Sequence, residues 1–128
     1  MTTMNMYKIT SSKTPYYYIG FTKNKLQKIY NNYISLFKKW KQTRERDIFN
    51  TSYLLLQFED TNIELIETFT YNNNDELNEK KENYLMKYEN ETVNNLTNIS
   101  RFWSDTDEVK KSPIQINKHK IIKSLRIP

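Results

Sequence analysis

Residues 6–21 read MYKITSSKTPYYYIGF, and this stretch decides how the fold begins. Residues 6–10 alternate apolar and polar side chains, which is typical of a strand that is buried on one face. Residues 11–15 carry Ser, Lys, Thr and Pro, a composition that favours a turn. Residues 16–21 are aromatic and β-branched, as in a second strand. The stretch therefore predicts a β-hairpin near the start of the chain.

A basic amphipathic helix is predicted directly after this hairpin. Thr22 or Asn24 can cap its first turn, because their side-chain oxygens can accept a hydrogen bond from a free backbone N–H. Apolar side chains then recur at helical spacing and make one face, namely Leu26, Ile29, Tyr30, Tyr33, Ile34, Phe37 and Trp40. We expect this face to pack in the core. Lysines cover much of the remaining surface, namely Lys25, Lys28, Lys38, Lys39 and Lys41.

The segment after this helix is predicted to return to the sheet. Residues 42–50 favour a loop or a short helical turn. Residues 53–58 form a short apolar run that fits either a short helix or a strand. Residues 62–69 predict a strand, and the side chains expected on one side of it are Ile63, Leu65 and Phe69.

A second long helix is predicted over residues 75–88, with Asn74 as its cap. Acidic residues in its first turn suit the helix dipole. Its apolar stripe consists of Leu77, Tyr84, Leu85 and Tyr88. The order of all these elements indicates an α+β fold, in which helices flank a small mixed or antiparallel three-stranded sheet.

We assign residues 1–98 to this domain and residues 99–128 to an extended, basic C-terminal arm. The periodicity decays from Ile99 onward, although Phe102 and Trp103 could anchor the arm to the domain. Beyond Pro113, isoleucines alternate with basic residues in a pattern that fits neither a helix nor a strand well. Because the arm cannot build a core of its own, we expect it to become ordered against a partner.

The net charge of +5 is unevenly distributed along the chain. Residues 1–46 carry +9, residues 47–98 carry −8 and residues 99–128 carry +4. A basic N-terminal third is typical of a surface that contacts phosphates, and the candidate contacts are Lys25, Lys38, Lys39, Lys41 and Arg44. Alternatively, the basic and acidic segments face each other within the fold. Charge alone does not decide between these two interpretations.

The composition excludes several classes of enzyme. The chain has no cysteine, one histidine (His119) and one glycine (Gly20). It therefore has no thiol nucleophile, no multi-histidine metal site and no glycine-rich phosphate loop. No apolar run approaches the roughly 20 residues of a membrane span, and the first residues do not resemble a signal peptide. We expect an intracellular protein that is not secreted and has no membrane partner.

The hairpin carries a resemblance to a known family. Met6-Tyr7-Lys8-Ile9 followed by Tyr18-Ile19-Gly20 resembles the signature of the GIY-YIG nuclease superfamily. Residues 82–86 resemble the helix that presents the family's metal-binding glutamate. The predicted elements come in the family's order over roughly residues 5–98. The similarity is closest to compact single-domain members of large DNA viruses, which fits the abundance of residues with A/T-rich codons.

This resemblance implies one-metal cleavage of a phosphodiester. Tyr7 would help to activate water with support from Tyr18, and Glu82 would hold a Mg²⁺ ion. Gly20 would permit close packing where a Cβ would intrude.

Two positions depart from the family's pattern. The helix arginine falls on Lys28 or Ile29, and a lysine keeps the charge but loses the planar fork that binds two phosphate oxygens. The family's helix histidine falls near Asn32 or Tyr33. An electrostatic stabiliser of this kind typically contributes about 10²–10³ in rate.

These departures favour a GIY-YIG-fold protein with a degenerate active site, acting as a non-catalytic structural or assembly subunit of a larger particle. A virus particle is the first expectation and a ribonucleoprotein the second. Residues 99–128 would dock onto other protein subunits, while the basic N-terminal third would contact DNA or RNA. The alternative is a Mg²⁺-dependent DNA endonuclease in which Tyr7, Tyr18 and Glu82 act with Lys28 in place of the arginine. A simple nucleic-acid-binding module is a third reading.

Overall fold

Three strands form the centre of the computed structural model, which describes residues 1–43 and 50–106. They are β1 (Thr2–Thr10), β2 (Tyr18–Thr22) and β3 (Asn62–Tyr71). β1 lies in the middle and pairs antiparallel with both neighbours, so the strand order is β2-β1-β3. The expected α+β fold with a three-stranded sheet is therefore confirmed, and the sheet is antiparallel throughout.

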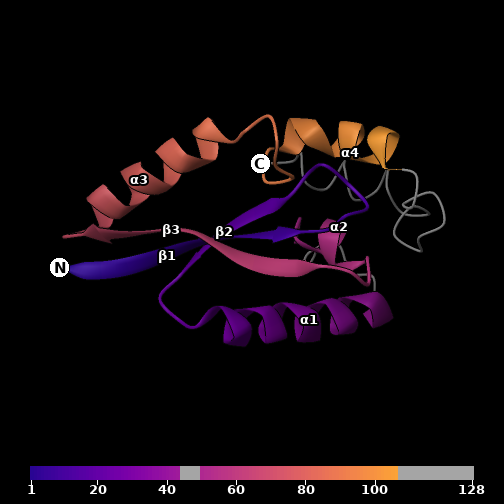
Figure 1. Ribbon diagram of the computed structural model, residues 1–128, viewed down its shortest axis with the longest axis horizontal. Helices are drawn as coiled ribbons and strands as arrows, with labels where there is room; N and C mark the ends of the chain where they lie inside the picture. Colours follow the sequence, from indigo (N-terminus) through magenta and orange to yellow (C-terminus); the bar gives the residue numbers. More distant parts are fainter. Residues whose placement is uncertain (44–49, 107–128) are drawn as a thin grey trace.

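Two long helices cover opposite sides of this sheet. Figure 1 shows α1 (Leu26–Thr43) on one side and α3 (Asn74–Lys87) on the other. Successive side chains of a strand point to opposite faces, so β1 contributes to both layers. We call the sheet face that carries Tyr7 and Ile9 the α1 face, and the face that carries Met4 and Met6 the α3 face.

The α1 face holds the larger core. All seven apolar residues expected on one face of α1 pack there, with Phe37 and Trp40 fully buried. The long helix is thus held by its apolar face, while its lysines remain outside. Within residues 1–43 and 50–106, no helix combines the length and the apolar character needed to cross a membrane.

The apolar run after residue 52 forms the short helix α2 (Tyr53–Leu56). All four of its residues are buried, and they belong to the same core as α1. This burial explains the sequence ambiguity, because a fully enclosed segment shows neither a helical nor a strand-like polar face. Part of the loop expected over residues 42–50 lies outside the described residues.

The first residues assigned to the C-terminal arm pack against the domain. After a 3₁₀ turn, η2 (Leu96–Asn98), the helix α4 (Ile99–Asp105) contributes the fully buried Ile99 and Phe102 to the α1-face core. The Thr106 hydroxyl then donates a hydrogen bond of 2.9 Å to the Thr14 hydroxyl. The packed part of the chain therefore extends to Thr106, and residues 107–128 of the arm lie outside the described residues.

A bulge in β3 corrects the expected side-chain pattern of that strand. Met6 pairs with Glu67, but the next residue, Tyr7, pairs with Leu65, so Ile66 is the additional residue on β3. Because of this extra residue, the odd-numbered side chains before the bulge and those after it point to opposite faces of the sheet. Ile63 consequently packs in the α1-face core and Phe69 in the α3-face core. Leu65, expected on the same side as Ile63, is 54% exposed.

The helix α3 begins with a reciprocal cap. The side chain of Asn73 accepts a hydrogen bond of 2.9 Å from the Glu76 N–H, and the Glu76 carboxylate accepts one of 3.2 Å from the Asn72 N–H. The cap is therefore Asn73, one residue before the expected Asn74, which is the first residue of the helix. The predicted stripe is found: Leu77, Tyr84, Leu85 and Tyr88 all pack on the α3 face.

The turn before β3 carries an acid-sensitive contact. The Asp60 carboxylate accepts hydrogen bonds from the Ser11 hydroxyl (2.5 Å) and the Ser12 N–H (3.0 Å), and the Ser12 hydroxyl donates to it as well. These hydrogen bonds lower the pKa of Asp60 to about 2 from its ordinary 3.8. A lowered pKa means that the ionised form stabilises the fold above pH 3.8, and that this contribution is lost as the pH falls through about 2.

We therefore expect Asp60→Asn to remove part of the acid sensitivity of the fold. Between pH 5 and pH 2, the free energy of unfolding of the native protein should fall more steeply than that of the variant. Urea titrations at several pH values in this range measure the difference. Glu59→Gln, at the neighbouring exposed position, is the matched control and should keep the native slope. Parallel pH profiles for the native protein and Asp60→Asn would contradict this account.

Candidate functional site

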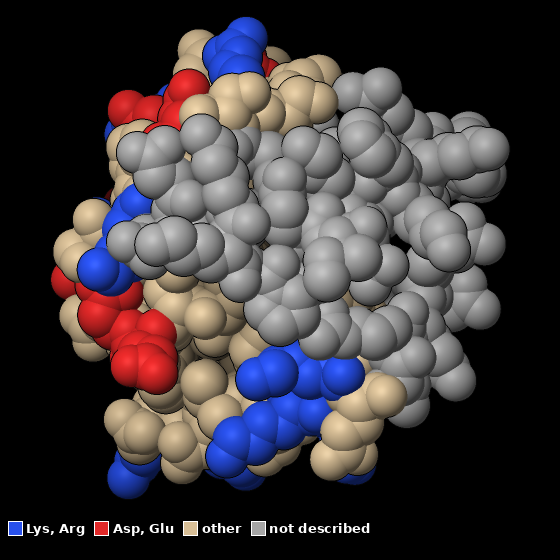
Figure 2. All heavy atoms as spheres, turned by 90° about the vertical axis from the view of Figure 1, so that its right-hand side faces the viewer, with Lys and Arg blue, Asp and Glu red and all other residues tan. Residues whose placement is uncertain are grey.

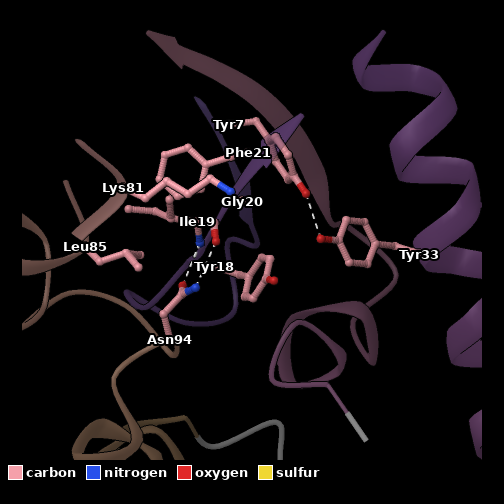
Figure 3. A pocket seen from close by; sticks show the side chains of 9 residues that line it. All are labelled: Tyr7, Tyr18, Ile19, Gly20, Phe21, Tyr33, Lys81, Leu85 and Asn94. Atoms are coloured by element: carbon pink, nitrogen blue, oxygen red, sulfur yellow. Dashed lines mark hydrogen bonds between the residues drawn. The ribbon is translucent and has the colours of Figure 1, made fainter. Parts of the chain in front are cut away.

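Three tyrosines from three different elements meet beside the hairpin. Tyr7 comes from β1, Tyr18 from β2 and Tyr33 from α1 (Figure 3). The Tyr7 and Tyr33 hydroxyl oxygens lie 2.7 Å apart and share a hydrogen bond. The Tyr18 and Tyr33 rings meet edge to face, with their centroids 5.9 Å apart. Two of these residues, Tyr7 and Tyr18, are the tyrosines that the GIY-YIG resemblance singled out.

The ring of Tyr7 lies directly over Gly20. The two residues are register partners of β1 and β2, so their side chains point to the same face of the sheet. A Cβ added at Gly20 would overlap Cζ and Oη of the Tyr7 ring. The only glycine of the chain is therefore placed where a ring occupies the space that any other side chain would need.

Burial raises the pKa of these phenols further above neutral pH. Tyr7 is only 2% exposed, and burial raises its pKa to about 12, although the hydrogen bond with Tyr33 acts in the opposite direction. The pKa values of Tyr18 and Tyr33 are also raised, again chiefly by burial. At neutral pH, all three side chains are hydrogen-bonding phenols and none is an anionic base.

A pocket of about 270 Å³ opens beside the tyrosines at the outer edge of β2. Its lining residues come from the sheet, from both long helices and from the segment after α3 (Figure 3). They are Tyr7, Tyr18, Ile19, Gly20, Phe21, Tyr33, Lys81, Leu85 and Asn94. The pocket thus lies where the N-terminal hairpin, α1 and α3 come together.

The segment after α3 closes part of the β2 edge. Tyr17 forms a parallel bridge with Thr92, with backbone hydrogen bonds to Glu91 and Val93. One step further, the Asn94 side chain accepts from the Ile19 N–H at 2.7 Å and donates to the Ile19 carbonyl at 2.8 Å. An amide side chain here satisfies the backbone groups that a fourth strand would otherwise pair.

The lining does not fit a Mg²⁺ ion. Its polar side chains are three phenols, one amide and the Lys81 ammonium, and none of the nine residues is Asp or Glu. Magnesium prefers carboxylate oxygens, and an ammonium group would repel it. Among the residues that the structure describes, no group of three or more His, Cys, Asp or Glu could hold a metal ion.

The two other residues expected in an active site lie elsewhere. Lys28 is exposed on α1 and Glu82 is exposed on α3, and neither lines the pocket. Two residues of α3 do line it, namely Leu85 and Lys81, and Lys81 stands directly before Glu82. Adjacent residues of a helix point about 100° apart, so this one-residue difference decides whether a lysine or a glutamate faces the tyrosines.

The basic residues gather on the solvent side of α1. Lys25, Lys28, Lys38 and Lys39 are exposed, and within residues 1–43 and 50–106 no ion pair joins them to a carboxylate. Figure 2 shows one group of Lys and Arg side chains on the lower part of one face, while other basic side chains lie beside acidic ones. Lys41 is also exposed and lies over the Phe37 ring, at 5.4 Å from its centroid. Arg44 lies outside the described residues.

The basic helix α1 and the acidic helix α3 are separated by the sheet. The acidic residues of α3 lie on the opposite side of the sheet from α1 (Figure 1). On the far side of the sheet from α1, the acidic helix forms its own ion pair, between Lys80 and Glu76. The basic and acidic helices therefore do not neutralise each other within the fold.

Three polar lining residues are not among the predicted site residues: Tyr33, Lys81 and Asn94. Tyr33 was assigned to the apolar face of its helix, which is correct but does not reveal that its hydroxyl reaches Tyr7. Lys81 is part of a charged run on α3. Which residue of this run points toward the pocket depends on the rotation of the helix about its axis. Asn94 belongs to an asparagine-rich stretch, and no local pattern separates it from Asn90 or Asn95.

Comparison with protein-family models, with curated proteins and with solved structures gives no match to this chain.

Replacing Gly20 by alanine should destabilise the protein. In an ordinary strand this change is favourable by about 0.5–1 kcal/mol, but here the new methyl group overlaps the Tyr7 ring. We expect a loss of about 1–3 kcal/mol in the free energy of unfolding, measured by urea denaturation.

The partner of this clash can be identified with a double variant. Gly20→Ala combined with Tyr7→Leu should cost less than the sum of the two single changes, by about 0.5–3 kcal/mol. Strict additivity, or a stabilising Gly20→Ala, would show that the ring of Tyr7 does not set the requirement for glycine.

Proposed function

We propose that this protein is a non-catalytic structural or assembly subunit of a larger particle, built on a GIY-YIG-like scaffold. The observation that carries the proposal is the state of Tyr7. Its hydroxyl is buried and bonded to Tyr33, and neither Lys28 nor Glu82 lines the pocket beside it. The residues that would have to cooperate in phosphodiester cleavage are therefore separated.

The chemistry of Tyr7 supports this proposal. A tyrosine that activates water has to accept a proton, and with a pKa of about 12 only about one molecule in 10⁵ is ionised at pH 7. The nearest cation in the lining, Lys81, is presented from α3 rather than from α1. A structural role for Tyr7 accounts for the same observations, because its ring fills the space above Gly20.

A Mg²⁺-dependent DNA endonuclease is the second candidate, and one observation favours it. Tyr7, Tyr18 and Gly20 do lie together and line one open pocket. In that case Glu82 and Lys28 would have to reach a substrate from outside the pocket, since both are exposed on the flanking helices.

The partner that we propose for the basic surface is the backbone of DNA or RNA. Between Leu26 and Thr43 the helix α1 contains no acidic residue. Lys28 and Lys39 are eleven residues apart, close to three helical turns, so they lie on one stripe about 16 Å long. Such a row of cations binds polyphosphate by releasing its counterions and reads no base sequence. Protein partners would dock through the part of the 99–128 arm that follows Thr106, because residues 99–106 pack on the domain itself; that part lies outside the described residues.

The activity is tested by incubating supercoiled and branched DNA with the native chain, with and without Mg²⁺. We expect no metal-dependent nicking, because the tyrosines are neutral and the predicted metal ligand is remote. Glu82→Ala is the comparison variant. Mg²⁺-dependent nicking that Glu82→Ala abolishes would establish the endonuclease and refute the non-catalytic proposal.

The nucleic-acid partner is tested by the salt dependence of binding to a short duplex of random sequence. Each phosphate contact contributes about 0.9 to the slope of log K against log salt. Lys28→Gln combined with Lys39→Gln should therefore reduce that slope by about 2, with little change between DNA sequences.

The matched control is Lys8→Gln combined with Lys87→Gln. It removes the same number of charges, but Lys8 is already paired with Glu64 and Lys87 belongs to α3, on the other side of the sheet. Its salt slope should stay within about 0.5 of the native one. An equal loss in both double variants would mean that net charge, and not the α1 surface, governs binding.

A further inference from the structure

The pocket contains a cation that the described residues leave without an anionic partner. On the same helix, Lys80 lies 3.5 Å from a Glu76 oxygen and donates to the Thr70 carbonyl at 2.7 Å. Lys81 makes no hydrogen bond or ion pair within residues 1–43 and 50–106. Its ammonium lies over the Phe21 ring at 5.6 Å from the centroid, and the side chain is partly buried. A partly desolvated ammonium gains much from an anion placed beside it.

The strand edge beside Lys81 also has unused groups. Tyr17 and Ile19 direct their backbone N–H and C=O groups outward, where the 91–94 segment binds them. Phe21 is two residues further along β2, so its backbone groups point the same way. Among the described residues none bonds to them. A donor N–H and the Lys81 ammonium therefore line the same side of the pocket.

The opposite wall supplies neutral phenols and apolar surface. Tyr7 and Tyr33 share one hydrogen bond, which uses one of their two hydroxyl hydrogens. Tyr33 also bonds to Tyr18, whose hydroxyl bonds to Asn50 as well, so the three phenols are already joined to one another and offer mainly their flat rings. Leu85, one helical turn after Lys81, adds apolar surface on the side of the lysine. The lining contains no carboxylate that would repel an anion. Its volume lies near the lower end of the roughly 300–1,000 Å³ of small-molecule sites.

We propose that this pocket binds a small ligand that carries an oxyanion, either phosphate or carboxylate, on a flat ring. The oxyanion lies against the Lys81 ammonium and the Phe21 N–H. The ring lies against Leu85 and the tyrosines. This inference goes beyond the assembly function and does not rest on it, because the pocket and the α1 lysines are separate surfaces.

Because the chain contains a single glycine, binding in the pocket can be followed by one NMR signal. Protein labelled with ¹⁵N-glycine gives one backbone amide signal, from Gly20 in the pocket wall. The probes are inorganic phosphate, adenosine monophosphate and benzoate, each titrated at constant ionic strength. We expect a saturable displacement of the Gly20 signal by at least one of them. A response to phosphate alone assigns binding to the oxyanion, and a response only to the two ring-bearing probes assigns part of it to the ring.

Variants of Lys81 and Lys80 distinguish binding in this pocket from a general effect of the protein's charge. Lys81→Gln should weaken binding about tenfold or more, as expected for loss of a charge-assisted hydrogen bond. Lys81→Arg should keep it, and Lys80→Gln, one residue away but outside the lining, should bind as the native protein does. The position of the unliganded Gly20 signal shows whether each variant keeps the pocket. No saturable displacement with any probe, or equal binding by Lys81→Gln, would overturn the proposal.

Discussion

The contact of the Tyr7 ring with Gly20 is the point on which the packing of the hairpin against α1 depends. The ring needs the space above a residue without a Cβ, and its hydroxyl then meets Tyr33 on α1. One side chain thereby joins both strands of the hairpin to the long helix. The contact also fixes the pairing of β1 with β2, because a shift by one residue would put Tyr7 opposite a side chain and turn the apolar residues to the wrong faces.

Most of the fold could be predicted from the sequence because its signals are local. The hairpin, the apolar face of α1 and the stripe of α3 each depend on spacing within one segment. The bulge in β3 could not be foreseen, since it arises from how Met6 and Tyr7 pair with a strand about 60 residues away, and it moves Phe69 to the opposite core from Ile63. The run at residues 53–56 was ambiguous for a related reason, because complete burial removes the polar face that distinguishes a helix from a strand.

The site was predictable only in part. Tyr7, Tyr18 and Gly20 lie together because they are neighbours in one hairpin. Glu82 was expected to face them and Lys81 does, a difference that depends on the rotation of α3 about its axis, set by the contacts of Leu77, Tyr84 and Leu85 with the sheet. Long-range packing thus decides which charge is presented, and it turns a site expected to attract a cation into one that suits an anion.

The hydrogen bonds that close the β2 edge have a consequence for the order in which the protein can assemble during synthesis. The Tyr17 backbone binds Glu91 and Val93, and the Ile19 backbone binds Asn94, so this edge is tied to residues 74 to 76 positions later in the chain. Until the ribosome has released those residues, the edge of β2 stays open along its whole length. Contacts of such separation form late in folding, and an uncovered strand edge is where chains add to one another. Between translation of the hairpin and translation of residues 91–94, this strand edge is therefore open to pairing with other chains.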